Sequence, residues 1–396
     1  MKKTERTLSM NTFEIIDGVL VKYHGEESDI TIPDGITAID EYAFCECKNL
    51  HSVKIPEGVI SIGLCAFDSC KNLQSVTIPD SVKVIGDYAF YGCENLQSVI
   101  LGNGITSIGS DAFSWCEKLA APNGLVIVGN TLFDCFGANS HIEIPNGVTK
   151  INDFAFSCCE HLQSITIPDS VTSIGDGAFE NCENLKDLIL PPGITSIGDR
   201  SFYECSHLQS AIIPNPVTYI GEEAFCGCSG LQTLIISEKI KVIGKKTFYG
   251  CSGLHSLTIP NGVTNIAESA FENCKNLKSI TLPDSVKSIG KKAFYGCLQL
   301  AEPNGMVIFQ NILFDYCGKE SHINIPDGTT VIGEGAFCDC ENLQSITIPD
   351  SVTAIESYAF FRCENLQSIF GISGSYAEIY AQESGIPFIK ISKKTF

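Results

Sequence analysis

The chain has 396 residues, of which 44% are hydrophobic and 18% are charged, and this composition excludes an intrinsically disordered protein. Acidic residues outnumber basic ones 46 to 26, which gives a formal net charge of −20. This sign disfavours a protein-wide interface with nucleic-acid phosphates or with an anionic membrane surface.

The N-terminus begins with the basic residues Lys2, Lys3 and Arg6, but no apolar segment of the length found in secretory signals follows them. No apolar run is long enough for a transmembrane helix. We therefore expect no membrane insertion and, by default, a protein that remains in the compartment where it is made. We assign residues 1–26 to a lead-in that caps the first coil.

A single repeat occupies residues 27–370. A phenylalanine followed three residues later by a cysteine recurs thirteen times, at intervals of 23 residues except for two steps of 43. The phenylalanines are Phe44, Phe67, Phe90, Phe113, Phe156, Phe179, Phe202, Phe225, Phe248, Phe271, Phe294, Phe337 and Phe360. Each long step equals one repeat plus an insert of 20 residues, so the inserts near 120–140 and 301–321 leave the repeat frame intact.

One copy, residues 73–95, shows how a coil is expected to fold. Apolar and polar residues alternate over residues 73–78, which predicts a strand, and Pro79 begins a turn. Gly86 predicts a tight corner with an unusual φ, and Asp87 is placed to cap a short helical turn that directs Phe90 inward. A coil this small cannot bury its apolar side alone, so stacked coils, and hence a solenoid, are expected.

The repeat, with its consensus I-P-D-S-V-x-x-I-G-x-x-A-F-x-x-C-x-N-L, resembles the BspA-like leucine-rich repeat family over nearly the whole chain. The resemblance implies a leucine-rich repeat solenoid with a β-sheet on one face and short helical turns opposite. Members of this family are commonly cell-surface or secreted proteins of bacteria and parasitic protists that are implicated in adhesion. The resemblance thus implies protein binding, cell adhesion and a cell-surface location.

Each insert repeats the pattern of the lead-in, so we interpret both as former N-terminal starts and expect irregular coils or small bulges with continuous stacking. Residues 371–396 are predicted to form a C-terminal cap. Ser375 and Glu378 have the spacing of a capping box at the start of a helix, Gly385 ends it, and Pro387 prevents its continuation. Phe388 then begins a last strand.

The thirteen repeated cysteines are predicted to form a column of buried free thiols rather than a disulfide ladder or a metal strip. Seven further cysteines lie outside this column, and the seven histidines have no fixed spacing to the thiols. No phosphate-binding, hydrolase or zinc-protease motif is present. We therefore expect no enzyme, no cofactor and no metal, and a cysteine-dependent enzyme is kept as an alternative.

The outward positions of the predicted strands are the candidate binding surface. Threonine is frequent there, but three consecutive coils carry isoleucine, which makes an apolar stripe, and polar residues flank it. The candidate partner-binding residues are Ile189, Ile212 and Ile235 with Lys186, Asp187 and Thr233. We expect a monomer whose stripe binds a protein partner. An intracellular scaffold using the same surface, and a carbohydrate-binding module using the Ser-x-Thr rows, are the alternatives.

Overall fold

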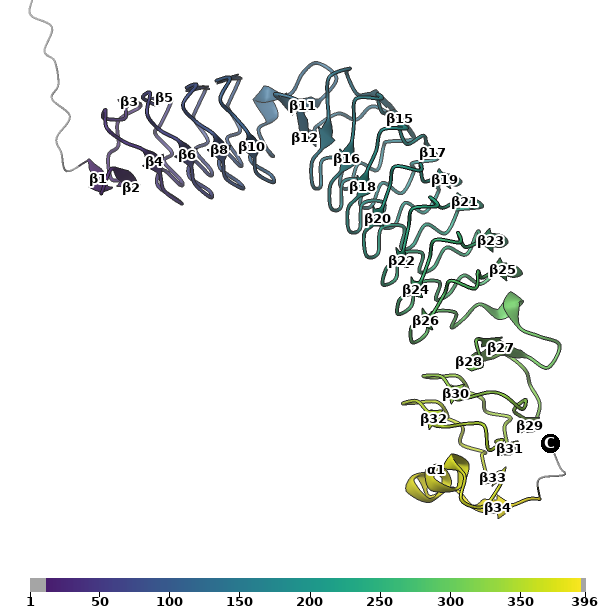
Figure 1. The fold of residues 1–396 in the computed structure, drawn as a ribbon. Coiled ribbons are helices and arrows are strands. Elements are labelled where there is room, and N and C mark those ends of the chain that lie inside the picture. The colour runs from purple at the N-terminus through teal and green to yellow at the C-terminus, as the bar shows by residue number, and fades with distance from the viewer. Residues whose placement is uncertain (1–11, 393–396) are drawn as a thin grey trace, which may run out of the picture. The chain divides into compact units, whose positions relative to one another are not determined.

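The structure is a computed structural model and describes residues 12–392, so residues 1–11 of the predicted lead-in lie outside the described residues. The chain divides into two compact units, residues 1–182 and 183–396. Both consist of stacked coils that carry short parallel strands (Figure 1). The predicted repeat solenoid is confirmed. Most coils contribute two strands, one at the predicted position and a second, two-residue strand that was not foreseen.

In the first unit, the strands at the predicted position form one set of parallel ladders. They are β3 (Asp29–Thr31), β5 (Ser52–Lys54), β7 (Ser75–Ile78) and β9 (Ser98–Leu101), then β13 (His141–Glu143) and β15 (Ser164–Thr166). The second set begins with the hairpin β1 (Phe13–Ile16) and β2 (Val19–Tyr23). It continues with β4 (Ala38–Ile39), β6 (Ser61–Ile62), β8 (Val84–Ile85) and β10 (Ser107–Ile108).

The first insert lies within this unit. It contains the 3-10 helix Glu117–Leu119 and the hairpin β11 (Leu125–Val128) and β12 (Thr131–Cys135). The second strand set then resumes with β14 (Lys150–Ile151) and β16 (Ser173–Ile174).

The second unit repeats this plan. Its strands at the predicted position are β17 (Asp187–Leu188), β19 (Ser210–Ile212), β21 (Thr233–Ile235), β23 (Ser256–Thr258), β25 (Ser279–Thr281), β29 (His322–Asn324), β31 (Ser345–Thr347) and β33 (Ser368–Gly371). Its two-residue strands are β18 (Ser196–Ile197), β20 (Tyr219–Ile220), β22 (Val242–Ile243), β24 (Asn265–Ile266), β26 (Ser288–Ile289), β30 (Val331–Ile332) and β32 (Ala354–Ile355). The second insert contains the 3-10 helix Leu298–Leu300 and the hairpin β27 (Met306–Phe309) and β28 (Ile312–Tyr316).

The repeated phenylalanines form the centre of the core. In the first unit, consecutive rings from Phe44 to Phe113 stack nearly parallel, with centroid separations of 4.7, 5.0 and 5.2 Å. These rings are fully buried. Each ring therefore packs against the coils before and after it, which makes burial of the core a property of the stack rather than of one coil.

The segment around each phenylalanine is a series of tight turns rather than the expected helical turn. Tyr88, Phe90 and Gly92 donate their backbone N–H groups to carbonyls of the following coil, at N–O distances of 2.9, 2.8 and 3.0 Å. The alternate residues, such as Ala89 and Tyr91, donate to carbonyls three residues back in their own coil. In a helix, all these N–H groups would donate to carbonyls of the same helix. The backbone carbonyls of the neighbouring coil would then have no donor.

This alternation requires left-handed backbone conformations. The residues two before and two after the phenylalanine have positive φ in each of the thirteen coils, as in Tyr88 (56°) and Gly92 (65°). Most of these residues are not glycine, although the left-handed conformation costs about 1–2 kcal/mol for other residues. The bonds to the next coil hold them in place.

Both inserts are β-hairpins, which corrects the expectation of irregular coils or small bulges. The three hairpins among residues 12–392 are antiparallel and share one irregularity, a register shift after Glu14, Val126 and Val307. The structure therefore agrees with the interpretation that each insert repeats the N-terminal lead-in. Packing of the core continues into the first insert, because Phe133 packs edge-on against Phe113 with centroids 5.5 Å apart. The strand ladder, however, is interrupted there.

An aspartate in each insert replaces the acceptor that a following coil would supply. The Asp134 carboxylate accepts the Trp115 N–H at 2.9 Å, and the Asp315 carboxylate accepts the Gly296 N–H at 2.7 Å. Burial raises the pKa of both carboxyl groups. The equivalent residue of the N-terminal hairpin is Lys22.

The predicted C-terminal cap is present. Helix α1 (Tyr376–Ser384) ends at Gly385 in the left-handed conformation, and β34 (Phe388–Lys390) pairs in parallel with β33. The capping box is wrong in detail, because Ser375 makes no side-chain cap and its hydroxyl is buried without a partner. Glu378 accepts instead from the Gly374 N–H at 2.6 Å.

Glycine is needed at this corner because the backbone of the preceding coil lies very close to it. The predicted unusual φ is not found. Gly86 does not have a positive φ. A Cβ atom there would lie 2.8 Å from the Gly63 carbonyl carbon and 2.8 Å from the Leu64 nitrogen. Real Cβ atoms do not approach the backbone this closely, so a side chain at this position pushes neighbouring coils apart.

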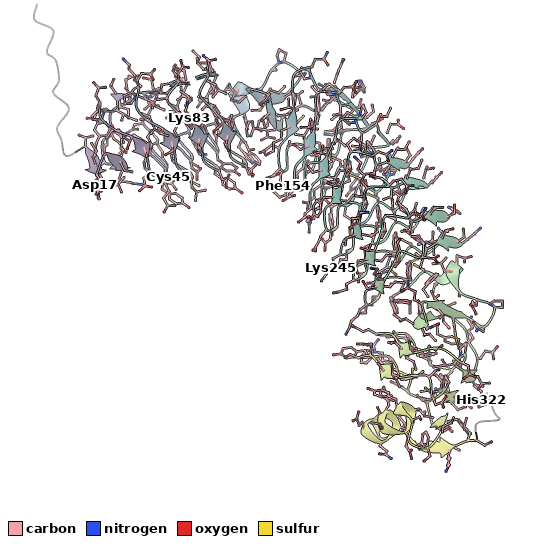
Figure 2. All side chains as sticks on the ribbon, viewed as in Figure 1. Asp17, Cys45, Lys83, Phe154, Lys245 and His322 are labelled. Carbon is pink, nitrogen blue, oxygen red and sulfur yellow. The ribbon has the colours of Figure 1, made fainter. Side chains whose placement is uncertain are left out.

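We predict that Phe90→Ala lowers the free energy of unfolding by about 3–5 kcal/mol, because it removes a ring packed on both faces. Phe154→Ala is the matched control, since this ring lies at the surface of the same unit (Figure 2). Urea unfolding followed by circular dichroism measures both. A loss below about 1 kcal/mol for Phe90→Ala would contradict the stacked core.

We predict that Gly86→Ala destabilises the protein by about 1–3 kcal/mol through the steric contact with the preceding coil. Gly147→Ala is the comparison, because Gly147 has a φ of 96° with no atom within 4 Å of an added Cβ. It should show only the backbone strain of about 1 kcal/mol. Equal and negligible losses in thermal unfolding would overturn the steric explanation.

Candidate functional site

The three candidate isoleucines lie on the surface of the second unit, in the coils of β17, β19 and β21. Ile189, Ile212 and Ile235 are 80, 56 and 53% exposed, so their predicted outward direction is confirmed. Ile212 lies directly opposite Ile235 in the parallel register of β19 and β21. Large apolar side chains with this exposure are costly to leave in water, and adjacent ones make a natural contact surface.

The strand period explains why these side chains point outward. Successive strand residues alternate between the two faces, and Leu188, Ala211 and Leu234 occupy the buried positions beside the isoleucines. A shift of one residue would bury the stripe and expose the core. The exposure is therefore a consequence of the same register that fills the interior.

The flanking polar candidates are also exposed. Thr233 lies opposite Ser210 in the ladder, and Lys186 and Asp187 precede the stripe in the coil of β17. The Lys186 carbonyl accepts the Gln209 N–H at 3.2 Å, which places Lys186 beside the neighbouring coil of the stripe. The structure thus brings all six candidates onto three adjacent coils.

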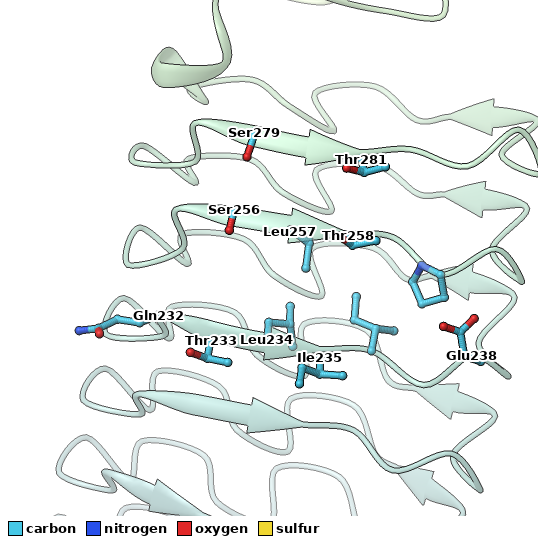
Figure 3. A pocket seen from close by; sticks show the side chains of 12 residues that line it. Gln232, Thr233, Leu234, Ile235, Glu238, Ser256, Leu257, Thr258, Ser279 and Thr281 are labelled. Atoms are coloured by element: carbon cyan, nitrogen blue, oxygen red, sulfur yellow. The ribbon is translucent and has the colours of Figure 1, made fainter.

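A shallow depression continues from the stripe, and sequence reasoning missed it. It has a volume of about 420 Å³ and lies over β21, β23 and β25 (Figure 3). Thr233 and Ile235 line one side, and the hydroxyls of Ser256, Thr258 and Thr281 are among the groups that line the rest. The Ser-x-Thr rows were the available sequence signal, but the sequence could not show that they border a hollow.

The turn side of this unit has a different electrostatic character. There Glu223 pairs with Arg200 at 3.3 Å and with Lys246 at 3.2 Å, and Lys245 pairs with Glu268 at 3.4 Å. The bond to Glu223 raises the pKa of Lys246. Because these charged side chains pair with each other between coils, they are less available to bind a partner than the unpartnered side chains of the apolar stripe.

The repeated cysteines behave as the predicted column of buried thiols. All twenty cysteines of the chain are free, and nine of the thirteen repeated ones are buried. A typical thiol, that of Cys93, donates to the Phe67 carbonyl at 3.3 Å. Burial raises the pKa of Cys116 and Cys182 to about 12, so these thiols stay protonated and unreactive near neutral pH.

The histidines make structural contacts. Nδ1 of His141 and of His322 lies 2.8 and 2.6 Å from the serine hydroxyl of the next coil, at equivalent positions after the two inserts. His51, His207 and His255 contact backbone carbonyls. Within residues 12–392, no group of three or more His, Cys, Asp or Glu side chains is arranged to hold a metal ion.

We predict that alkylation of the folded protein labels Cys158 and Cys317 first, because these two thiols are exposed. The nine buried thiols of the column should react only after denaturation, because the reagent cannot reach them in the folded protein. Iodoacetamide labelling at pH 8 followed by peptide mass spectrometry measures the order. Fast labelling of a buried thiol such as Cys93 would instead favour the cysteine-dependent enzyme.

In the part of the chain that the structure describes, no helix has the length and apolarity needed to cross a membrane.

The family model described as the BspA type leucine-rich repeat region matches residues 22–133, 126–255, 195–312, 241–367 and 307–383. Among solved structures, a leucine-rich repeat protein from Bacteroides ovatus is 30% identical, with 95% of this chain and 94% of that chain covered and a TM-score of 0.47. A leucine-rich cell surface protein from Faecalibacterium prausnitzii is 28% identical, with 94% of each chain covered and a TM-score of 0.41. A leucine-rich repeat protein from T. pallidum is 31% identical over 43% of this chain and 81% of that chain, with a TM-score of 0.41. No curated protein matches this chain.

Proposed function

This chain belongs to the BspA type leucine-rich repeat family, and we propose that it is a non-enzymatic recognition module that binds a protein partner through the sheet face of its second unit. The observation that carries the proposal is the exposed stripe of Ile189, Ile212 and Ile235. Adhesion to a protein on another cell or surface is the role that we assign to this binding.

The stripe has the composition of an interface centre. Three adjacent isoleucines form its apolar middle, and Lys186, Asp187 and Thr233 form part of a polar rim. Full burial of an exposed side chain of this size contributes about 1.5–3 kcal/mol, so the three together add a substantial apolar contribution to a complex. The acidic net charge of −20 supports a protein partner over a nucleic acid.

An intracellular scaffold would use the same stripe, so the geometry of the stripe does not distinguish adhesion from scaffolding. Protease treatment of intact source cells does. Release of fragments of this chain from unbroken cells supports adhesion, and full protection until lysis supports the scaffold.

A carbohydrate-binding role is the second candidate, and the depression beside the stripe favours it. Hydroxyls of Ser256, Thr258, Ser279 and Thr281 line this depression (Figure 3). Rows of hydroxyls can exchange hydrogen bonds with sugar hydroxyls. Binding of the protein to a glycan array would favour this role, whereas capture of a protein from a deglycosylated lysate would favour the first.

We predict that changing Ile189, Ile212 and Ile235 together to aspartate weakens partner capture at least tenfold, because it removes the apolar anchors and places three charges in the interface. Capture from native lysate, quantified by mass spectrometry, measures the effect.

The matched control changes Thr77, Ile100 and Thr166 to aspartate. These residues occupy the same outward column in the first unit and are exposed. The control adds the same charge and should leave capture unchanged. Equal capture by both triple variants would refute the stripe as the binding surface.

A further inference from the structure

A break in the strand ladder of the first unit leaves an open groove. Among the described residues, β10 pairs with β8 alone and β11 pairs with β12 alone, so the two strands face the break with unpaired edges. A hollow of about 550 Å³ lies there, between the coil of β10 and the tip of the inserted hairpin. We call this hollow the β10 groove.

The β10 groove has an apolar floor. Leu101, Ile105 and Ile108 line it and are only partly buried. The equivalent residues of the preceding coil, Ile78, Val82 and Ile85, are at most 1% exposed. The floor is therefore core that the break has left uncovered. Lys150 is the one charged residue among those that line the hollow.

The second unit contains the same break, and there the hairpin fills it in part. Its hairpin carries Phe309 and Gln310 where the first hairpin carries Val128 and Gly129. Phe309 packs against Phe294 with ring centroids 4.6 Å apart. Gln310 reaches across the break and donates from Nε2 to the Val286 carbonyl at 2.7 Å.

The first unit has the smaller, buried Val128 at the position of Phe309, and Gly129 supplies no side-chain donor in place of Gln310. Ile105 is the residue equivalent to Val286, and in the described residues no side chain donates to its carbonyl. Val286 is 4% exposed, whereas Ile105 is only partly buried. The other two floor positions, Leu101 and Ile108 here and Leu282 and Ile289 there, are partly buried in both breaks. The chain thus shows, in its own second copy, the chemistry that completes this site: an N–H donor on the carbonyl and an apolar group beside it.

We propose that the β10 groove binds an extended peptide segment of a partner protein. The peptide places an N–H donor on the Ile105 carbonyl, as Gln310 does on Val286, and an apolar side chain against Leu101 and Ile108. An extended chain fits because an unpaired parallel edge accepts a further strand about 4.8 Å away. The neighbouring Lys150 disfavours basic peptides and tolerates acidic ones.

The test places the hairpin residues of the second break at the equivalent positions of the first. A library of fluorescent heptapeptides with apolar residues at alternate positions is screened on the wild-type protein, and the selected peptides are titrated by fluorescence polarisation. Val128→Phe with Gly129→Gln should weaken their binding at least tenfold. Gln310 itself adopts a φ of 46°, so glutamine is accommodated at this turn position. Selection of no peptide, or unchanged affinity in the double variant, would overturn the proposal.

The reciprocal variant keeps the proposal testable if the filled variant does not fold. Phe309→Val with Gln310→Gly should open the second break and raise the peptide stoichiometry from one to two. A stoichiometry that stays at one contradicts the proposal. The aspartate triple variant of the stripe lies in the other unit and should bind the peptides normally, so failure of the stripe and failure of the groove are distinguishable.

Discussion

Each coil depends on the next one for its backbone hydrogen bonds, and the rest of the structure follows from this constraint. Around each phenylalanine, alternate N–H groups donate to the following coil, and the residues between them donate within their own coil. A buried N–H without a partner costs about 1–3 kcal/mol, so no coil is stable at an open end. The left-handed residues, the hairpin starts and the C-terminal cap are consequences. The aspartates of the inserts show the rule most directly, since Asp134 and Asp315 accept an N–H that has no following coil to receive it.

The same constraint restricts where function can reside. The phenylalanine and cysteine columns are required by packing and carry no information about a partner. Variation is tolerated only at outward strand positions, at the turn edge and at the inserts. The isoleucine stripe is one such departure, because neighbouring coils outside it mostly carry threonine at the same position. The β10 groove is another, because the two hairpins differ at Val128 and Gly129 in an otherwise shared design. Recognition in a repeat protein is expected at the points where the repetition is broken.

Much of the fold was predictable, because apolar periodicity reports directly which residues face the core. The period, the first strand set, the buried thiols and the outward direction of Ile189, Ile212 and Ile235 followed from it. Two of the errors share one cause. Gly86 was assigned to an unusual φ, yet its role is to let another coil's backbone approach, and the segment around Phe90 was expected to be helical, yet its donors serve the next coil. Both depend on contacts between residues 22–23 positions apart, which a local pattern does not display.

The sequence by itself determined the solenoid, its coil boundaries, its caps and the face that carries the stripe, since all of these depend on residue type within one period. Only the tertiary structure decided that the inserts are hairpins, that a hollow lies beside Ile235, and that Gln310 bridges the second break whereas no such bridge crosses the groove at β10. These features arise where the strands of two consecutive coils do not pair with each other. The width of such a gap depends on the distance between stacked backbones, which no single coil specifies.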